Sequence, residues 1–190
     1  MVPITGQIHE EIYYRHEIYK LIGMKGSGLY IPEHFGISTY WKSTGCYRGF
    51  QMRYKVFNKE LILDRMKVNT KQVPPPINGI SPQKIRTRFA NFDFGYKYLN
   101  LKSKFTGSLL IGKDFIRSMY VHMGFQKPKT FKTVLELHVD DGNVTEIKDL
   151  SKDVENIRKR EELRKRRDPY YKGSKGTPLD FIDDSFSLDY

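Results

Sequence analysis

The chain has 190 residues, of which 38% are hydrophobic and 14% aromatic, and its formal net charge is +11. This length suits one domain with a hydrophobic core, and the many Tyr and Phe residues are typical of a folded β-rich protein. The single cysteine, Cys46, excludes an internal disulfide, and the sequence holds no run of about 18 apolar residues to cross a bilayer. Residues 1–6 lack the pattern of a signal peptide, so we expect a cytoplasmic protein without a membrane span.

The positive charge lies mostly in the first 150 residues. Residues 1–150 contain 23 Lys and Arg against 13 Asp and Glu, a net +10, and residues 151–176 contain 10 against 5, a net +5. Residues 177–190 contain no Lys or Arg and four Asp, a net −4. A basic body attracts nucleic acid, anionic lipid or an acidic protein, and the alternative is a surface whose charge only keeps the protein soluble.

The first predicted elements lie in residues 8–23. β-Branched and aromatic residues around Arg15 and His16 predict two short strands with a tight connection. A helix is the alternative, because four apolar residues fall on one helical stripe: Ile8, Ile12, Tyr19 and Ile22. The three glycines of residues 23–28 predict a flexible loop.

Residues 50–57 alternate apolar and polar side chains and are the clearest strand of the sequence. A two-residue turn at Asn58 and Lys59 would return the chain as a hairpin. The expected register contains two apolar pairs and one charged pair: Val56 with Leu61, Tyr54 with Leu63, and Arg53 with Asp64.

Residues 71–82 include three consecutive prolines, which cannot form a central strand and predict a long surface connection. Ser81 and Pro82 then resemble the start of a short helix, expected at 82–89. Farther along, 105–111 and 115–125 are predicted as buried strands, separated by a break at 112–114.

A second hairpin is expected from residues 131–139 and 144–149, around the turn Asp140-Asp141-Gly142, with Leu137 opposite Ile147. Ser151 then resembles the N-cap of a charged helix near 152–167. The apolar residues of this helix are too few for a wide buried stripe, so we expect it to project or to lie shallowly on the body. They are Val154, Ile157 and Leu163.

Together these patterns predict a mainly β fold. We expect an antiparallel meander that forms a partly open barrel or a two-sheet sandwich in residues 1–150, then a basic helix at 151–167 and a flexible acidic and aromatic tail at 168–190. Because the tail is opposite in charge to the body, it is expected to dock on a partner or on the body itself.

Two glycine patterns resemble phosphate-binding loops. The first, from Gly107 to Gly112 and Lys113, has the right spacing, but Asp114 replaces the hydroxyl that holds magnesium and the intervening residues are strand formers. The second, residues 23–28, is not followed by a clear helix. Neither pattern therefore predicts a nucleotide site.

The histidines and the cysteine give weak indications of chemistry. No paired spacing places metal ligands on one helix face, so we predict neither a metal site nor a cofactor. His138 is interpreted as a hydrogen-bonded surface residue and His122 as a buried core residue. A small enzyme would require a pocket near His34, Tyr120 or His122. Cys46 is interpreted as a structural thiol.

Basic and aromatic residues interleave at several places, as they do in single-strand binders, where cations follow the phosphates and rings stack on bases. The leading hypothesis is a non-enzymatic module that binds an anionic partner, with nucleic acid favoured and an acidic protein next. A protein-interaction subunit that acts through the C-terminal helix and tail is the first alternative, and the small enzyme is the second. The candidate nucleic-acid-binding residues are Arg48, Arg53, Lys55, Lys84, Arg86, Arg88, Lys97, Arg158, Arg160 and Arg164.

Overall fold

The computed structural model describes residues 6–86, 92–120, 122 and 124–168. The strands of this part of the chain are β1 (Glu11–Tyr14), β2 (Glu17–Ser27), β3 (Phe50–Phe57), β4 (Glu60–Val68), β5 (Gln83–Lys84), β6 (Phe94–Lys102), β7 (Thr106–Phe115), β8 (Phe131–Asp140) and β9 (Asn143–Asp149). The single-turn helices η1 (Pro32–Phe35), η2 (Arg117–Met119) and η3 (Pro128–Thr130) lie in the connections, and α1 (Ser151–Arg167) follows β9. No helix of the described residues is both long and apolar enough to span a membrane.

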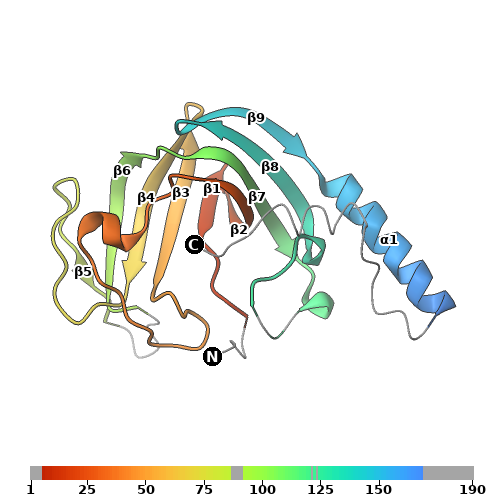
Figure 1. The fold of residues 1–190 in the computed structure, drawn as a ribbon, viewed down its shortest axis with the longest axis horizontal. Helices are drawn as coiled ribbons and strands as arrows, with labels where there is room; N and C mark the ends of the chain where they lie inside the picture. The colour runs from red at the N-terminus through yellow and green to blue at the C-terminus, as the bar shows by residue number, and fades with distance from the viewer. Residues whose placement is uncertain (1–5, 87–91, 121, 123, 169–190) are drawn as a thin grey trace.

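Seven of the described strands form a closed barrel, in the order β3-β1-β2-β7-β8-β9-β4, and a β3–β4 pairing completes the ring (Figure 1). β6 adds to the other edge of β4 and carries β5, so the sheet extends beyond the barrel. The mainly β prediction is therefore confirmed. The described strands pair antiparallel except β1 and β3, which run parallel. The β2–β7 and β4–β9 pairings also depart from a simple meander, because they join strands that are distant in sequence.

Both predicted hairpins form, with their apolar registers as expected. Val56 pairs with Leu61 and Tyr54 with Leu63 in the first, and Leu137 pairs with Ile147 in the second. The charged pair is wrong, because a bulge at Asp64 shifts the register and places Arg53 opposite Arg65.

Two segments in which glycines predicted a break or a loop instead lie within strands. β2 continues to Ser27, because Gly26 lies against Gly107 of β7 and a Cβ on Gly107 would come within 2.0 Å of the carbonyl oxygen of Lys25. β7 likewise continues through Gly112, where a Cβ would come within 2.8 Å of the Phe131 ring. These glycines let backbone or an aromatic ring approach closely, which period-2 patterns alone do not reveal.

Two further predictions in the middle of the chain are wrong. Residues 83–84 form the short strand β5 instead of a helix over 82–89, because they pair with β6, and 87–91 lie outside the described residues. β7 ends at Phe115, and the rest of the predicted strand 115–125 begins with the turn η2. The surface connection at 71–82 is confirmed as a segment without a strand longer than the isolated Ile77–Ile80 bridge.

The barrel interior holds the main hydrophobic core, to which alternate residues of every long strand contribute. Its largest fully buried side chains include Leu21, Tyr54, Met66, Leu109 and Leu137. A smaller core lies on the outer side of β2, β7 and β8, where α1 covers it, and consists of Ile22, Leu110, Phe131, Val134 and Val154.

The helix α1 is attached mainly by its first half, and in its second half the Glu161 carboxylate pairs with Lys129 (3.1 Å). Val154 and Ile157 are buried, and the Arg158 guanidinium donates hydrogen bonds to the carbonyl oxygens of Lys129 (3.3 Å) and Phe131 (2.7 Å). Ser151 is not the N-cap as predicted, because α1 begins at Ser151 and Leu150 occupies the N-cap position. The backbone N–H of Ser151 donates to the Asp149 carboxylate (2.9 Å). The second half of α1 extends past the barrel (Figure 1).

Truncating the buried face of α1 tests this attachment. Ile157 is 8% exposed and Leu163 is 54% exposed. We expect Ile157→Ala to lower the free energy of unfolding by about 2–4 kcal/mol, because it opens a cavity, and Leu163→Ala to change it by less than about 0.5 kcal/mol. Urea unfolding measures both, and equal losses would contradict the packing described.

His9 is a buried residue that no sequence pattern singled out. Its Nδ1–H donates to the carbonyl oxygen of Leu21 (2.7 Å), and its Nε2 accepts from the backbone N–H of Gln126 (3.3 Å). This pattern fixes the neutral ring, since a protonated ring would place two donors against each other. Burial lowers the pKa of His9 to about 4 from its ordinary value of 6.5.

The lowered pKa of His9 makes stability depend on pH. The unfolded chain binds a proton at His9 below about pH 6.5 and the folded chain only below about pH 4, so stability falls as pH falls between these values. We expect a loss of about 2 kcal/mol between pH 7 and pH 5, and His9→Gln should remove most of that dependence. Urea unfolding at both pH values checks it, and equal pH dependence in the two proteins would contradict the role of His9.

Candidate functional site

A row of charged residues crosses the outer face of five neighbouring strands. Their backbones lie side by side in the order Lys20 of β2, Glu11 of β1, Arg53 of β3, Arg65 of β4 and Lys97 of β6. Because adjacent strands lie about 4.8 Å apart, the row is about 19 Å long. We call the outer surface formed by this row, together with Lys67 and Lys84, the basic face.

The acidic member of the row links its first two cations. Glu11 accepts hydrogen bonds from Lys20 and from the Arg53 guanidinium, whose Nε lies 2.8 Å from Oε2. Burial opposes the ionised form, but the hydrogen bonds and charges of Lys20 and Arg53 outweigh it and hold the pKa of Glu11 below its usual value. This carboxylate is therefore already neutralised by the protein's own groups.

The other end of the row places like charges next to one another. Arg53 lies opposite Arg65, and Arg65 lies opposite Lys97. Arg65 also contacts the Asp64 carboxylate at 3.3 Å, and Lys55 shares that carboxylate at 3.1 Å. Lys97 has no carboxylate partner among the described residues. Like charges directly opposite each other destabilise a sheet, so this arrangement is not explained by folding.

Lys67 lies on the same face, two residues after Arg65 on β4. Its ammonium donates to the Gln51 side-chain oxygen (3.3 Å), and Gln51 in turn donates to the backbone carbonyl of His9 (2.9 Å). Desolvation lowers the pKa of Lys67, and the charges of Arg53, Lys20 and Arg65 lower it further against the opposing charge of Glu11. The positive charge here is therefore only partly compensated within the protein.

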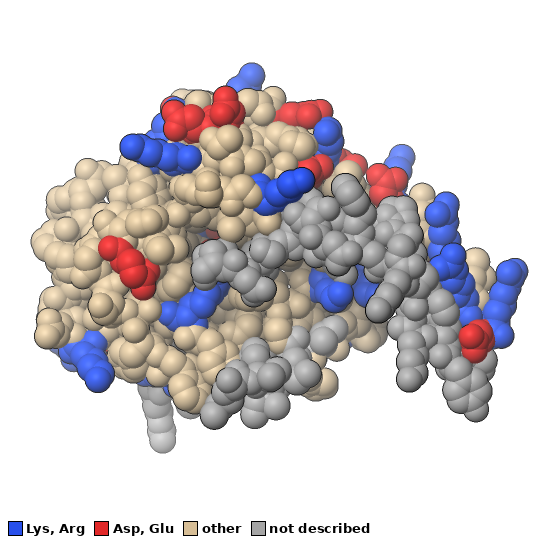
Figure 2. Space-filling model, in the orientation of Figure 1, with Lys and Arg blue, Asp and Glu red and all other residues tan. Residues whose placement is uncertain are grey.

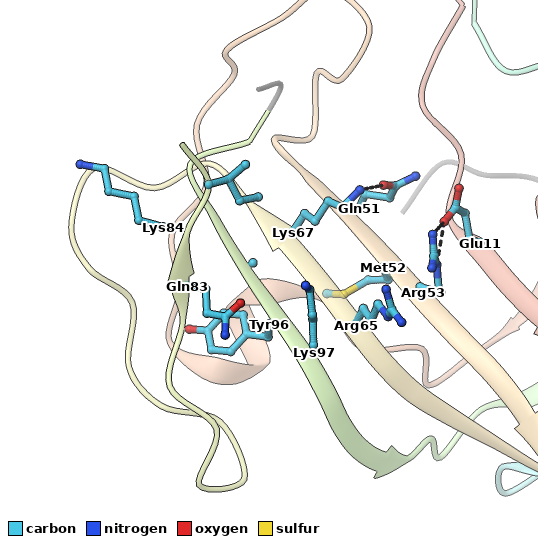
Figure 3. Close-up of a pocket in the computed structure, with 12 residues that line it drawn as sticks. Glu11, Gln51, Met52, Arg53, Arg65, Lys67, Gln83, Lys84, Tyr96 and Lys97 are labelled. Carbon is cyan, nitrogen blue, oxygen red and sulfur yellow. Dashed lines mark hydrogen bonds and ion pairs between the residues drawn. The ribbon is translucent and has the colours of Figure 1, made fainter. Parts of the chain in front are cut away.

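A cavity of about 300 Å³ opens on the basic face, and β5 and Ile85 form one wall of it (Figure 3). Gly95 of β6 lies beside that wall, where a Cβ would come within 3.4 Å of the Ile85 side chain. Figure 3 shows Arg53, Arg65, Lys67 and Lys97 along neighbouring strands, whereas the Lys84 side chain extends outward. The lining contains five cations and one carboxylate, a net +4: Arg53, Arg65, Lys67, Lys84, Lys97 and Glu11.

The structure brings together three of the predicted nucleic-acid-binding residues, Arg53, Lys84 and Lys97. Arg86 is exposed just after β5, and Arg88 lies outside the described residues. Lys55 is engaged with Asp64 and Asn100. Arg48 is half-buried and pairs with the Glu10 carboxylate at 2.8 Å, which gives it a structural role.

The predicted α1 candidates belong to another surface. Arg158 anchors the helix to the barrel, and Arg160 and Arg164 are exposed. Figure 2 shows Lys and Arg along α1 at the right of the view, while Asp and Glu gather at the top, over the barrel end that holds the β3–β4 and β8–β9 turns.

Sequence analysis missed Lys20, Arg65 and Lys67. Each alternates with buried residues, so each pattern predicts an outward side chain but not which charges become neighbours. The missing information is strand order: the parallel β1–β3 pairing joins Glu11 to Arg53, and the bulge at Asp64 brings Arg65 opposite Arg53.

The three residues proposed for an enzyme pocket do not share one set of contacts. Tyr120 contacts the His122 ring edge-on at 5.1 Å, whereas the contacts of His34 are with Tyr30 and Ile31. His122 is exposed, so its interpretation as a core residue is wrong. His138 is partly exposed and its Nδ1 is hydrogen-bonded to the Ser108 hydroxyl (3.0 Å), whereas its Nε2 is buried without a hydrogen-bond partner among the described residues. Within the described ranges no group of three His, Cys, Asp or Glu side chains is placed to hold a metal ion.

Comparison with known proteins gives no relative: no protein-family model, no curated protein and no solved structure matches the chain. The basic face must therefore be interpreted from its own geometry.

The crowding of charge predicts that one substitution on this face stabilises the fold. We expect Lys97→Gln to raise the free energy of unfolding by up to about 0.5–1 kcal/mol at low salt, because it removes repulsion from Arg65. Lys102→Gln is the matched control on β6, since Lys102 pairs with Glu60 (3.0 Å) and Asn143 (2.8 Å), and it should lower stability by about 0.5 kcal/mol. Urea unfolding of both variants checks this, and a destabilised Lys97→Gln protein would argue that the cations are not in conflict.

Proposed function

We propose that the chain binds nucleic acid by its phosphate backbone on the basic face. The observation that carries the proposal is the uninterrupted run of Arg53, Arg65 and Lys97 across three strands. A bound polyanion would remove the repulsion among these side chains, and it would favour the charged form of Lys67, whose pKa is lowered by desolvation and by the neighbouring cations.

The shape of the face favours an extended ligand over a single phosphate group. The cations are arranged in a row rather than a ring, with Lys67 and Lys84 beside it around an open cavity. The row begins with Lys20 and ends with Lys97, so a chain of phosphates can contact cations along the length of the row. An acidic protein segment is the second candidate, because the same charges attract carboxylates.

The test uses variants that leave no acidic residue unpaired. Lys67 and Lys97 have no carboxylate partner among the described residues, so Lys67→Gln/Lys97→Gln removes two charges from the face without disturbing an ion pair. Lys152→Gln/Arg160→Gln removes two charges from exposed positions of α1 and is the matched control. The measurement is fluorescence anisotropy of labelled DNA and RNA 20-mers between about 50 and 200 mM salt.

We expect the unaltered protein to bind with an affinity that falls steeply with salt. The basic-face variant should bind about tenfold or more weakly, with a salt slope reduced by about 2, whereas the α1 variant should change little. Equal losses in the two variants would contradict a site on the basic face. Absence of binding at low salt would contradict nucleic-acid binding. Displacement of the labelled nucleic acid by polyglutamate at equal charge concentration would favour the acidic protein segment instead.

A further inference from the structure

The basic face has an exposed aromatic ring at one corner. Tyr98 of β6 is 63% exposed, and the Arg65 guanidinium carbon lies 5.8 Å from the centre of its ring. The Lys97 side chain points outward, so strict alternation along β6 would point the Tyr98 side chain toward the core. Instead, residues 98–100 form an irregular segment between the Lys97–Arg65 and Leu101–Leu63 pairs.

The exposure of Tyr98 requires an unfavourable backbone. Its φ is +62°, and that of Asn100 is +50°, a region that residues with side chains adopt rarely. Bulges of this kind re-aim a side chain, and strained backbone gathers at functional sites. The irregular segment buries Leu99 in the main core and leaves the Tyr98 ring outside it. The exposed ring adds nothing to core packing, so we interpret its position beside Arg65 as the functional result of the bulge.

A second exposed ring lies near the Lys67 end of the face. Trp41 is 50% exposed and stacks on Tyr47, with ring centres 5.3 Å apart and planes inclined by 22°. The next residue, Lys42, pairs with Asp93 at 2.6 Å, and Tyr40 donates to the same carboxylate at 2.7 Å.

These contacts connect the Trp41 loop to the basic face. Asp93 is adjacent in sequence to Phe92, and the Lys67 ammonium lies 5.9 Å from the centre of the Phe92 ring. The backbone N–H of Tyr40 also donates to the carbonyl oxygen of Asn69, just beyond β4 (3.1 Å). Along β4 the cations Lys67 and Arg65, with Lys97 opposite Arg65, therefore lie between Tyr98 and the loop that carries Trp41.

We propose that the ligand of the basic face is a single-stranded nucleic acid whose bases stack on Trp41 and Tyr98 while its phosphates contact the cations between them. This inference rests on the proposed function, to which it adds the strand state of the ligand. Ring stacking requires unpaired bases, because a duplex already covers both faces of each base, whereas cations alone bind single and double strands.

Trp41 is the only tryptophan of the chain, so its emission reports on its own surroundings. The probes are a 20-mer of deoxythymidine, an abasic 20-mer with the same phosphates, and a 20-base-pair duplex. We expect the deoxythymidine 20-mer to bind about ten- to a hundredfold more tightly than the abasic one and to quench the emission of Trp41, which the abasic strand leaves unchanged.

Substitutions assign the stacking to the two rings. Trp41→Leu and Tyr98→Leu should each weaken binding of the deoxythymidine 20-mer by about five- to tenfold and leave binding of the abasic strand unchanged. Phe57→Leu is the matched control, because Phe57 is 59% exposed but lies at the β3–β4 turn, and it should affect neither.

The outcomes separate the two proposals. Equal affinity for the deoxythymidine and abasic strands, with unchanged emission of Trp41, would overturn stacking and leave phosphate binding intact. Tighter binding of the duplex would also overturn it. Absence of binding to every probe at low salt would overturn the proposed function itself.

Discussion

The alternation of side chains along a closed sheet is the constraint on which the structure depends. Each strand residue points either into the barrel or away from it, and the interior is filled mainly by apolar groups, such as Leu63 and Met66 of β4. Polar residues of the same strands are therefore forced onto the outer face at regular intervals. Strand order then decides which charges meet, and here it places Arg53, Arg65 and Lys97 side by side.

The same constraint explains how far the sequence could be interpreted. The two hairpins were predictable because their alternation and turns are local: Asn58-Lys59 and Asp140-Asp141-Gly142 each join strands that are neighbours in sequence. α1 was predictable because the pattern changes at Ser151. Closure of the barrel was not, since the β1–β3 and β2–β7 pairings join distant segments on which no local pattern reports.

The site was harder to predict than the fold. Arg53 and Lys97 stood out because aromatic residues adjoin them, but so does Arg48, which proves to be engaged with Glu10. A regular register would have paired Arg53 with Asp64, which attract each other. The one-residue bulge at Asp64 instead places Arg53 opposite Arg65, which repel each other. Such bulges depend on how the strands twist and on how the sheet closes into a barrel, and the alternation pattern of a sequence does not reveal them.

Glu11 has an importance beyond its own ion pairs. It holds Lys20 and Arg53 on either side of a parallel strand junction, so charge pairing supports the point where the chain first departs from a simple meander. Parallel pairing is slightly weaker per residue than antiparallel pairing. The carboxylate thus stabilises the junction and at the same time fixes one end of the basic face.

The closure between β4 and β9 is short. Among the described residues the two strands share the single pair Glu60 and Asn143, and hydrogen bonds from Leu61 to Gly142 and from Val144 to Lys59 flank it. β9 then diverges toward α1, and its remaining edge is not paired with β4. The barrel is therefore closed between β4 and β9 at one end of these strands only. Amide protons on the unpaired edge of β9 should exchange with solvent before those of β4, which is paired with β3 and β6 along most of its length. β9 contributes no residue to the basic face, so that exchange would not report on a molecule held there.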